Sequence, residues 1–311
     1  MVRVSSVKEI MSSCVDFSVL ERYNDTSGLK RIGSVSEDVR SLFSSEFLKY
    51  ANGLFFDLKD REIDTVVFSV FLDQNCLDYV LNQLDGKKVL IVVHHFFDID
   101  CGYQESSSGT DSFFCEPELY KRLYASKVQI CVLHLPLDIN SSRINTHKSF
   151  LENVWGAKKL QQAIYSFPFA EMGYYLHLEK EAFNFVEQFD KILYYGNQYA
   201  NCNDAIQGLR TICDSRPLKV AVWSGMTNTT DILKEMENQK CDFCLCGDVI
   251  IRNRSDRSAK VLTYLENMPL NVFCVSHYQS ELFALKDLAK KLESLKKDLH
   301  VHVIEDKEIW K

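Results

Sequence analysis

Residues 88–94 have the sequence KVLIVVH. Between its first and last residues this run is entirely apolar, and it is followed directly by a second histidine. A short, continuously apolar run is typical of a strand that is buried on both faces of a parallel sheet. The stretch therefore predicts an α/β protein with parallel strands at its centre.

Comparable strand signals recur along the chain, with helical patterns between them. Strands are expected at 64–71, 128–135, 191–196, 218–225, 241–248, 271–277 and 299–305. Helices are expected through much of the first fifty-odd residues and at 73–84, 117–126, 143–155, 182–189, 229–239 and 279–295. Strands that alternate with helices indicate βα units. We expect two α/β lobes with largely parallel sheets, the first spanning 1–155 and completed by 282–311, the second spanning 156–281.

The bulk composition excludes some classes of function. The 311 residues carry a formal net charge of −7 and no basic tract, which argues against nucleic-acid binding through a phosphate-tracking surface. No apolar run reaches the roughly 20 residues that span a bilayer, and the N-terminus lacks the apolar region of a signal peptide. The sequence predicts a cytoplasmic protein without a membrane segment, in which an anionic substrate would need a local positive site such as a metal ion.

The cysteines allow two readings. The chain has 11 of them, and Cys241, Cys244 and Cys246 lie close together in CDFCLCGD. Three neighbouring thiols suggest zinc, but no second CxxC segment accompanies them. The segment is also short, apolar and strand-like, and buried free cysteines behave as small hydrophobic side chains. We predict reduced structural thiols that bind no metal.

Candidate metal ligands follow three of the expected strands. The strand at 88–94 ends in His94 and His95, and the strand at 128–135 ends in HLPLD, which contains His134 and Asp138. A third strand ends in HYQSE, which contains His277 and Glu281. Ligands in α/β sheets gather at the carboxyl ends of strands. Each signal alone also fits a structural histidine or a surface acid, and their joint placement favours a metal site.

The spacings suit a site with two ions. His277 and Glu281 are four residues apart, so they share one face of a helix that begins near 277. Neighbouring side chains on a strand diverge, so we expect His94 and His95 to bind different ions of a pair about 3.5–4 Å apart. Mixed imidazole and carboxylate ligands suit Zn, Fe, Mn or Co. The remaining histidines lie in exposed-looking or alternating contexts and receive no function: His147, His177, His300 and His302.

Five segments, in their order along the chain, carry a resemblance to a known family. They are NDTSGL at 24–29, VVHHFFD, VLHLPLD, CGD at 246–248 and VSHYQSE. They resemble the motifs of the dinuclear-metal proteins called GTP cyclohydrolase 1 type 2 homologs, or NIF-three-like proteins. Phe96 stands where that family usually has a proline, and Arg252 stands where it often has a histidine.

The resemblance implies a fold and a ligand set. It implies two α/β lobes with the metal site in the cleft between them, and ring-shaped homo-oligomers that are often hexamers. The metal ligands would be His94, His95, Asp138, His277 and Glu281, with Glu281 bridging two ions. His134 would be a nearby group that moves a proton.

Two functions remain open on this basis. The first is a metal-dependent hydrolase that acts on a nucleotide-like small molecule, as the family name GTP cyclohydrolase suggests. The second is a non-enzymatic metal-binding module or a regulatory interaction partner. An open coordination position beside a substrate cleft would favour the enzyme, whereas a saturated metal shell would favour the module.

Overall fold

The structure is a computed structural model. It describes residues 1–19, 55–56, 61–72, 74–95, 103–105, 111–113, 122, 125–126, 128–156, 165–166, 171–227, 229–249 and 256–305. NDTSGL at 24–29, Phe96, Arg252 and most of the helix expected at 117–126 lie outside these residues. The chain folds into two compact units. The first comprises Met1–Leu137, Ser142–Ile144 and Leu285–Glu308, and the second Asp138–Ser141, Asn145–Ala284 and Ile309–Lys311.

A five-stranded sheet forms the centre of the first unit, in the order β16-β4-β5-β8-β2. Its strands are β2 (Phe55–Phe56), β4 (Thr65–Phe71), β5 (Val89–His95), β8 (Gln129–Val132) and β16 (His300–Val303). The first four strands of this order are parallel, and β2 pairs antiparallel with β8. Every residue of β5 is buried, so the apolar run forms the central parallel strand that its sequence predicts.

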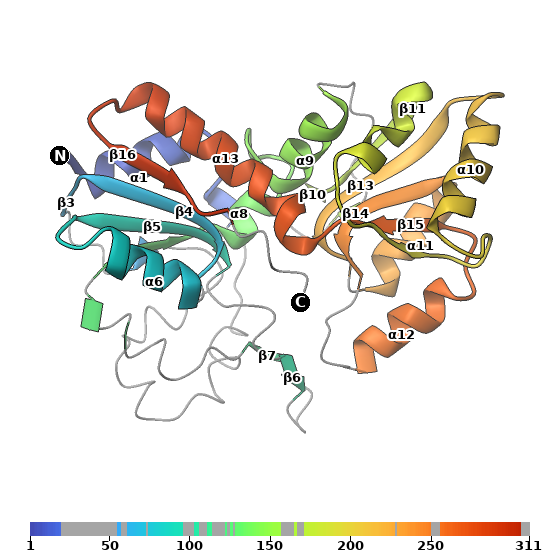
Figure 1. Ribbon diagram of the computed structural model, residues 1–311, viewed down its shortest axis with the longest axis horizontal. Helices are drawn as coiled ribbons and strands as arrows, with labels where there is room; N and C mark the ends of the chain where they lie inside the picture. The colour runs from blue at the N-terminus through green and yellow to red at the C-terminus, as the bar shows by residue number, and fades with distance from the viewer. Residues whose placement is uncertain are drawn as a thin grey trace. The chain divides into compact units, whose positions relative to one another are not determined.

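Helices cover both faces of this sheet (Figure 1). The helix α6 (Gln74–Gln83) packs Leu77 and Val80 against Val67, Ile91 and Val93 of the sheet. On the opposite face lie α1 (Val4–Ser12) and the part of α13 (His277–Leu295) that belongs to this unit. Smaller elements complete the unit: β1 (Val2–Arg3) paired with β3 (Glu62–Ile63), β6 (Tyr103–Glu105) paired with β7 (Asp111–Phe113), and the start of α8 (His134–Asp138).

The second unit has a mixed five-stranded sheet in the order β11-β13-β14-β15-β12. Its strands are β11 (Tyr174–Leu178), β12 (Leu193–Tyr195), β13 (Leu218–Met226), β14 (Phe243–Asp248) and β15 (Asn271–Cys274). The three central strands are parallel, whereas β11 and β12 pair antiparallel at the two edges. The sequence predicts the central strands and β12, but it predicts no strand at β11.

Apolar side chains from one face of this sheet form the core of the second unit. They pack against α9 (Thr146–Trp155), the 3-10 helix η3 (Lys180–Glu187) and α10 (Cys202–Cys213). The expected helix at 182–189 is this 3-10 helix. Two further helices contact each other, α11 (Thr230–Asn238) and α12 (Asp256–Leu265). The unit also contains two antiparallel strands of two residues each, β9 (Tyr165–Ser166) and β10 (Glu171–Met172).

Local capping residues explain where two helices begin and one ends. The side chain of Asn145 accepts a hydrogen bond from the Lys148 amide at the start of α9, and Gly156 closes that helix with φ 72°. Thr229 caps α11 by accepting from the Ile232 amide. Such caps satisfy backbone groups that the helix itself leaves unpaired. The end of α9 at Trp155 matches the helix expected at 143–155, and α11 lies within the helix expected at 229–239.

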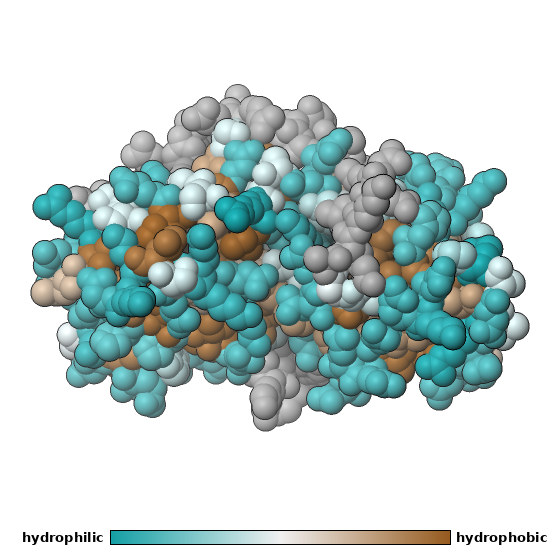
Figure 2. Space-filling view, turned by 90° about the horizontal axis from the view of Figure 1, so that it is seen from above, coloured by the Kyte–Doolittle hydropathy of each residue, from teal (hydrophilic) through white to brown (hydrophobic). Residues whose placement is uncertain are grey.

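The surface of the described residues is largely polar. Hydrophilic residues cover most of the face in Figure 2, and hydrophobic ones appear there in small groups. Among the described residues the large hydrophobic side chains that are exposed are Met1 and Leu295. Within the same residues no helix has the length and apolar character that crossing a membrane requires.

Candidate functional site

Three histidines gather at the carboxyl ends of β5 and β8 in the first unit. His94 and His95 end β5, and His134 begins α8 directly after β8 and Leu133. The ring centroids of His94 and His95 lie 4.2 Å apart, and they lie 5.2 Å and 4.5 Å from that of His134. One ring nitrogen from each histidine falls within 4.8 Å of the other two. This group could hold a metal ion.

The closeness of His94 and His95 differs from the expectation that they diverge. Neighbouring side chains on a strand leave the sheet on opposite faces. Here both rings lie at the edge where β5 ends and both face His134, so the body of the sheet does not separate them. The predicted divergence of His94 and His95 is therefore wrong at the end of β5.

Hydrogen bonding and stacking fix the orientation of the two rings. Nε2 of His94 lies 3.2 Å from the backbone oxygen of His134. Because a carbonyl oxygen only accepts, Nε2 donates this bond. In the neutral ring Nδ1 then carries a lone pair, which points away from the bond to the His134 oxygen. The ring of His95 stacks on Phe71 with a centroid distance of 5.3 Å. Both imidazoles are buried, at 0% and 9% exposed, and are therefore held in place by the fold itself.

Asp138 ends the short helix whose first residue is His134. The spacing of four residues places the two side chains on one face of that turn. Oδ1 of Asp138 accepts a hydrogen bond of 2.9 Å from Oγ1 of Thr146, at the start of α9. This bond holds the half-buried carboxylate in one orientation.

The pair His277 and Glu281 begins α13 in the second unit. Ser276 caps the helix by accepting from the Gln279 amide over 3.2 Å, and His277 is the first helical residue. Nε2 of His277 lies 2.9 Å from Oε1 of Glu281, and the Glu281 side chain is only 3% exposed. The prediction that the two share the first turn of a helix beginning at 277 is confirmed.

The burial of His147 differs from the sequence prediction. Its context looks exposed, but the side chain is 1% exposed on the inner face of α9. Nδ1 of His147 accepts from the backbone amide of Ser224 over 3.0 Å and lies 2.9 Å from Oγ of the same serine. Local sequence carries no signal for this contact, because 77 residues separate the two partners.

The three neighbouring cysteines lie in or beside the strand β14. Cys244 and Cys246 are fully buried, and Sγ of Cys246 lies 3.5 Å from Sγ of Cys274 on the adjacent strand. Burial raises the pKa of Cys241 to about 12. Cys244 and Cys246 occupy core positions, as the prediction of a strand implies, and Cys241 just before the strand is partly buried. That they bind no metal stays a prediction.

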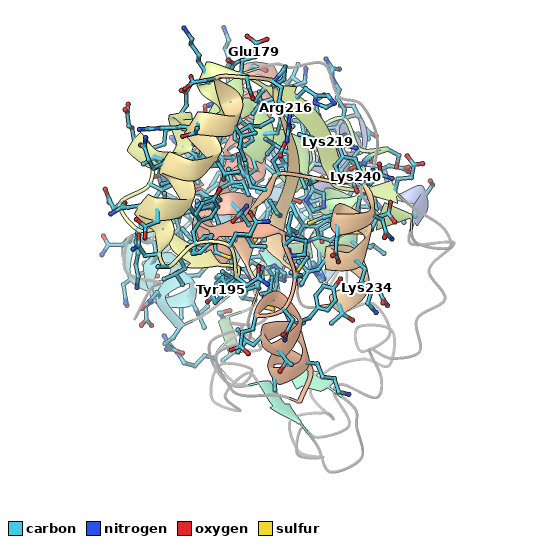
Figure 3. The ribbon with its side chains drawn as sticks, turned by 90° about the vertical axis from the view of Figure 1, so that its right-hand side faces the viewer. Glu179, Tyr195, Arg216, Lys219, Lys234 and Lys240 are labelled. Carbon is cyan, nitrogen blue, oxygen red and sulfur yellow. The ribbon has the colours of Figure 1, made fainter. Side chains whose placement is uncertain are left out.

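Basic residues of the second unit gather away from the carboxyl ends of its strands. Arg216, Lys219 and Lys240 lie near one another at the amino ends of β13 and β14 (Figure 3). Arg216 pairs with Asp242, and Nζ of Lys219 lies 5.0 Å from the centre of the Tyr175 ring. Arg216 and Lys219 have these local partners, and all three cations lie at the amino ends of the strands, so they do not supply positive charge beside Glu281.

The fold and these side chains define an α/β protein with candidate metal-ligating histidines and acids. The model of the family Duf34/NIF3 (NGG1p interacting factor 3) matches residues 46–308, and the chain belongs to this family. The predicted resemblance to NIF-three-like proteins is therefore confirmed. A search of curated proteins found no match to the chain.

Solved structures share the fold at low sequence identity. Reduced HcgD from Methanocaldococcus jannaschii has a TM-score of 0.56 and 16% identity, covering 89% of this chain and 98% of its own. A Bacillus cereus protein related to NIF3 has a TM-score of 0.55 and 12% identity, covering 88% and 97%. The protein ybgI, described as of unknown function, has a TM-score of 0.55 and 17% identity, covering 90% and 98%. These likenesses show that the architecture is common to all of them.

Proposed function

We propose that the chain binds two divalent transition-metal ions and uses them to hydrolyse a nucleotide-like small molecule. The proposed ligands are His94, His95, Asp138, His277 and Glu281, with Glu281 bridging the ions. The observation that carries the proposal is the convergence of three imidazoles at the carboxyl ends of β5 and β8. Membership in the NIF3 family supports it.

The donor set has the chemistry that such ions require. Imidazole nitrogens with carboxylate oxygens suit Zn, Fe, Mn or Co, and no thiolate is needed. The bond from Nε2 of His94 to the His134 carbonyl is the kind of outer hydrogen bond that orients a metal-ligating histidine. It leaves Nδ1 as the atom that His94 would offer to an ion.

Each side chain has a definite task in the proposed reaction. Two bound ions would lower the pKa of a water molecule and polarise the bond under attack. His134 would accept a proton from the attacking water and deliver it to the leaving group, since imidazole titrates near neutral pH. Asp138 and Glu281 would supply negative charge that offsets the repulsion between two cations. The ions would also provide the positive charge that an anionic nucleotide needs.

Turnover of nucleotides by metal-loaded protein tests the proposal. The protein would be loaded separately with Zn²⁺, Mn²⁺ or Fe²⁺ and incubated with GTP and other nucleoside triphosphates, and products would be identified by chromatography and mass spectrometry. We expect turnover that disappears with a chelator and in Glu281→Gln. Metal-loaded protein that transforms none of these nucleotides would contradict the proposed substrate class and favour the non-enzymatic metal-binding module.

We further propose a cytoplasmic homohexamer, on the strength of the family resemblance alone. Light scattering coupled to size-exclusion chromatography measures the mass of the particle in solution. A mass of six chains supports the proposal, and a monomeric mass at all concentrations contradicts it.

A further inference from the structure

We infer that Gly225 is a positioning residue for Glu281, an inference that rests on the proposed metal-binding function. Gly225 lies in β13 with φ +68° and faces the first turn of α13. A methyl group on its Cα would collide with Oε1 of Glu281 and come within 3.4 Å of Nε2 of His277. The absence of a side chain at this position therefore gives the carboxylate its place.

The backbone around Gly225 is held from two sides. Ser224 is held against α9 by His147. Its backbone amide donates a hydrogen bond of 3.0 Å to Nδ1 of His147, and its hydroxyl oxygen lies 2.9 Å from the same nitrogen. The amide of Gly225 donates a hydrogen bond of 2.8 Å to Oγ of Ser280 on α13. A strand anchored in this way cannot shift easily to make room for an added methyl group, so the side chain of Glu281 would have to move.

A second glycine, Gly247, lets α13 lie close enough for Glu281 to contact Gly225. A methyl group on Gly247 in β14 would lie 2.5 Å from both the Gly225 oxygen and Oγ of Ser280. Oγ of Ser280 in turn donates to the backbone oxygen of His277 over 2.8 Å. Gly225 and Gly247 thus form the surface on which the first turn of α13 rests, and Ser280 joins that turn to it; we call the two glycines the glycine seat.

The glycine seat matters for metal binding because ligand geometry has narrow tolerances. A functional side chain must stay within about 0.5 Å of its productive position. A methyl group that displaces the Glu281 carboxylate also disturbs its hydrogen bond to His277, which is 2.9 Å long. Metal affinity should therefore fall although no proposed ligand has been replaced.

A double-mutant cycle with a matched control tests the inference. The variants are Gly225→Ala, Glu281→Asp and their combination, and the control is Gly86→Ala. Gly86 has φ +76° and no atom within 4 Å of an added methyl group, so this substitution carries the same kind of backbone strain without the collision. Zn²⁺ affinity would be measured by competition with a chromophoric chelator, beside melting temperature.

We expect Gly225→Ala to weaken Zn²⁺ binding about 10–100-fold, the range typical when the support of a ligand is lost. Gly86→Ala should bind Zn²⁺ as the wild type does. In the Glu281→Asp background, where the carboxylate is one carbon shorter, Gly225→Ala should have little further effect. Additive effects of the two substitutions, or wild-type affinity in Gly225→Ala, would overturn the inference.

A spectroscopic readout separates this inference from the proposed function. The ¹⁵N chemical shift of His277 Nε2 reports its hydrogen bond to Glu281 in protein stripped of metal. We expect the shift to change in Gly225→Ala and to stay as in the wild type in Gly86→Ala. Wild-type protein that binds no Zn²⁺ would reject the metal function, whereas an unchanged His277 signal in Gly225→Ala would reject the role of Gly225.

Discussion

Nε2 of His277 lies 2.9 Å from Oε1 of Glu281, one turn further along α13. The carboxylate is 3% exposed and lies against the backbone of Gly225. Burial of an ionised acid is unfavourable unless charged or hydrogen-bonding partners compensate for the lost water. A partly buried imidazole supplies one such partner here, and a metal ion would supply a stronger one. The environment of Glu281 therefore favours a cation beside its carboxylate.

Replacing Glu281 by Gln should separate metal binding from folding. Gln has nearly the same volume and keeps an acceptor oxygen, but it loses the charge that would hold two cations together. We expect Glu281→Gln to lose at least one ion per chain, measured by elemental analysis, while its circular dichroism spectrum stays unchanged. Glu293→Gln, at an exposed position of the same helix, serves as the control. Equal metal in Glu281→Gln and the wild type would reject the bridging role.

His134→Ala should impair the protein in a different way. A residue that orients ligands and moves protons typically contributes roughly 10–100-fold to affinity or activity, and its loss does not empty the site. We expect His134→Ala to retain metal and to lose turnover by that factor. His300→Ala, an exposed histidine of the same unit, is the control. Loss of a full ion equivalent in His134→Ala would instead identify His134 as a ligand.

The cysteines of β14 should be dispensable for metal. Simultaneous replacement of Cys241, Cys244 and Cys246 by Ala should leave metal content unchanged, because imidazoles and carboxylates are the proposed ligands. The melting temperature should fall, since Cys244 and Cys246 are fully buried and their removal leaves space in the core. A decrease of one ion per chain would show that a thiolate binds metal.

Cys241 should make stability depend on alkaline pH. Burial raises its pKa to about 12 in the folded chain, whereas an unfolded cysteine titrates near about 8.5. Above about pH 8.5 the thiol of Cys241 loses its proton in the unfolded chain, whereas it keeps the proton in the folded chain. The free energy of unfolding contributed by Cys241 is therefore fully present below about pH 8.5 and declines as pH rises toward the folded value. Urea unfolding of the wild type and Cys241→Ala between pH 8 and 10 measures it, and parallel curves would contradict the assignment.

The central parallel strands could be predicted from the sequence because burial on both faces leaves a local signature. The apolar run that becomes β5 carries this signature, and so do the runs that become β13 and β15. The edge strand β11 gave no such signal, and its pairing with β13 joins residues 40 to 48 positions apart. An antiparallel edge is set by tertiary pairing, so periodicity in one segment does not reveal it.

The candidate site likewise contains features that follow from local sequence and others that depend on distant contacts. The pair of His277 and Glu281 follows from helical spacing alone, and the sequence predicts it correctly. The burial of His147 against Ser224 and the seat that Gly225 offers to Glu281 bring together residues more than fifty positions apart. Contacts of this kind follow from the completed fold and cannot be inferred from spacing.

Metal content per chain measures directly whether the protein binds two metal ions. The protein would be purified without chelators and without added metal, and its transition metals would be counted by elemental analysis before and after addition of Zn²⁺, Mn²⁺ or Fe²⁺. We expect up to two ions per chain, held through the histidines and acids at the strand ends. Protein that carries no metal and takes up none of the three ions would contradict this expectation.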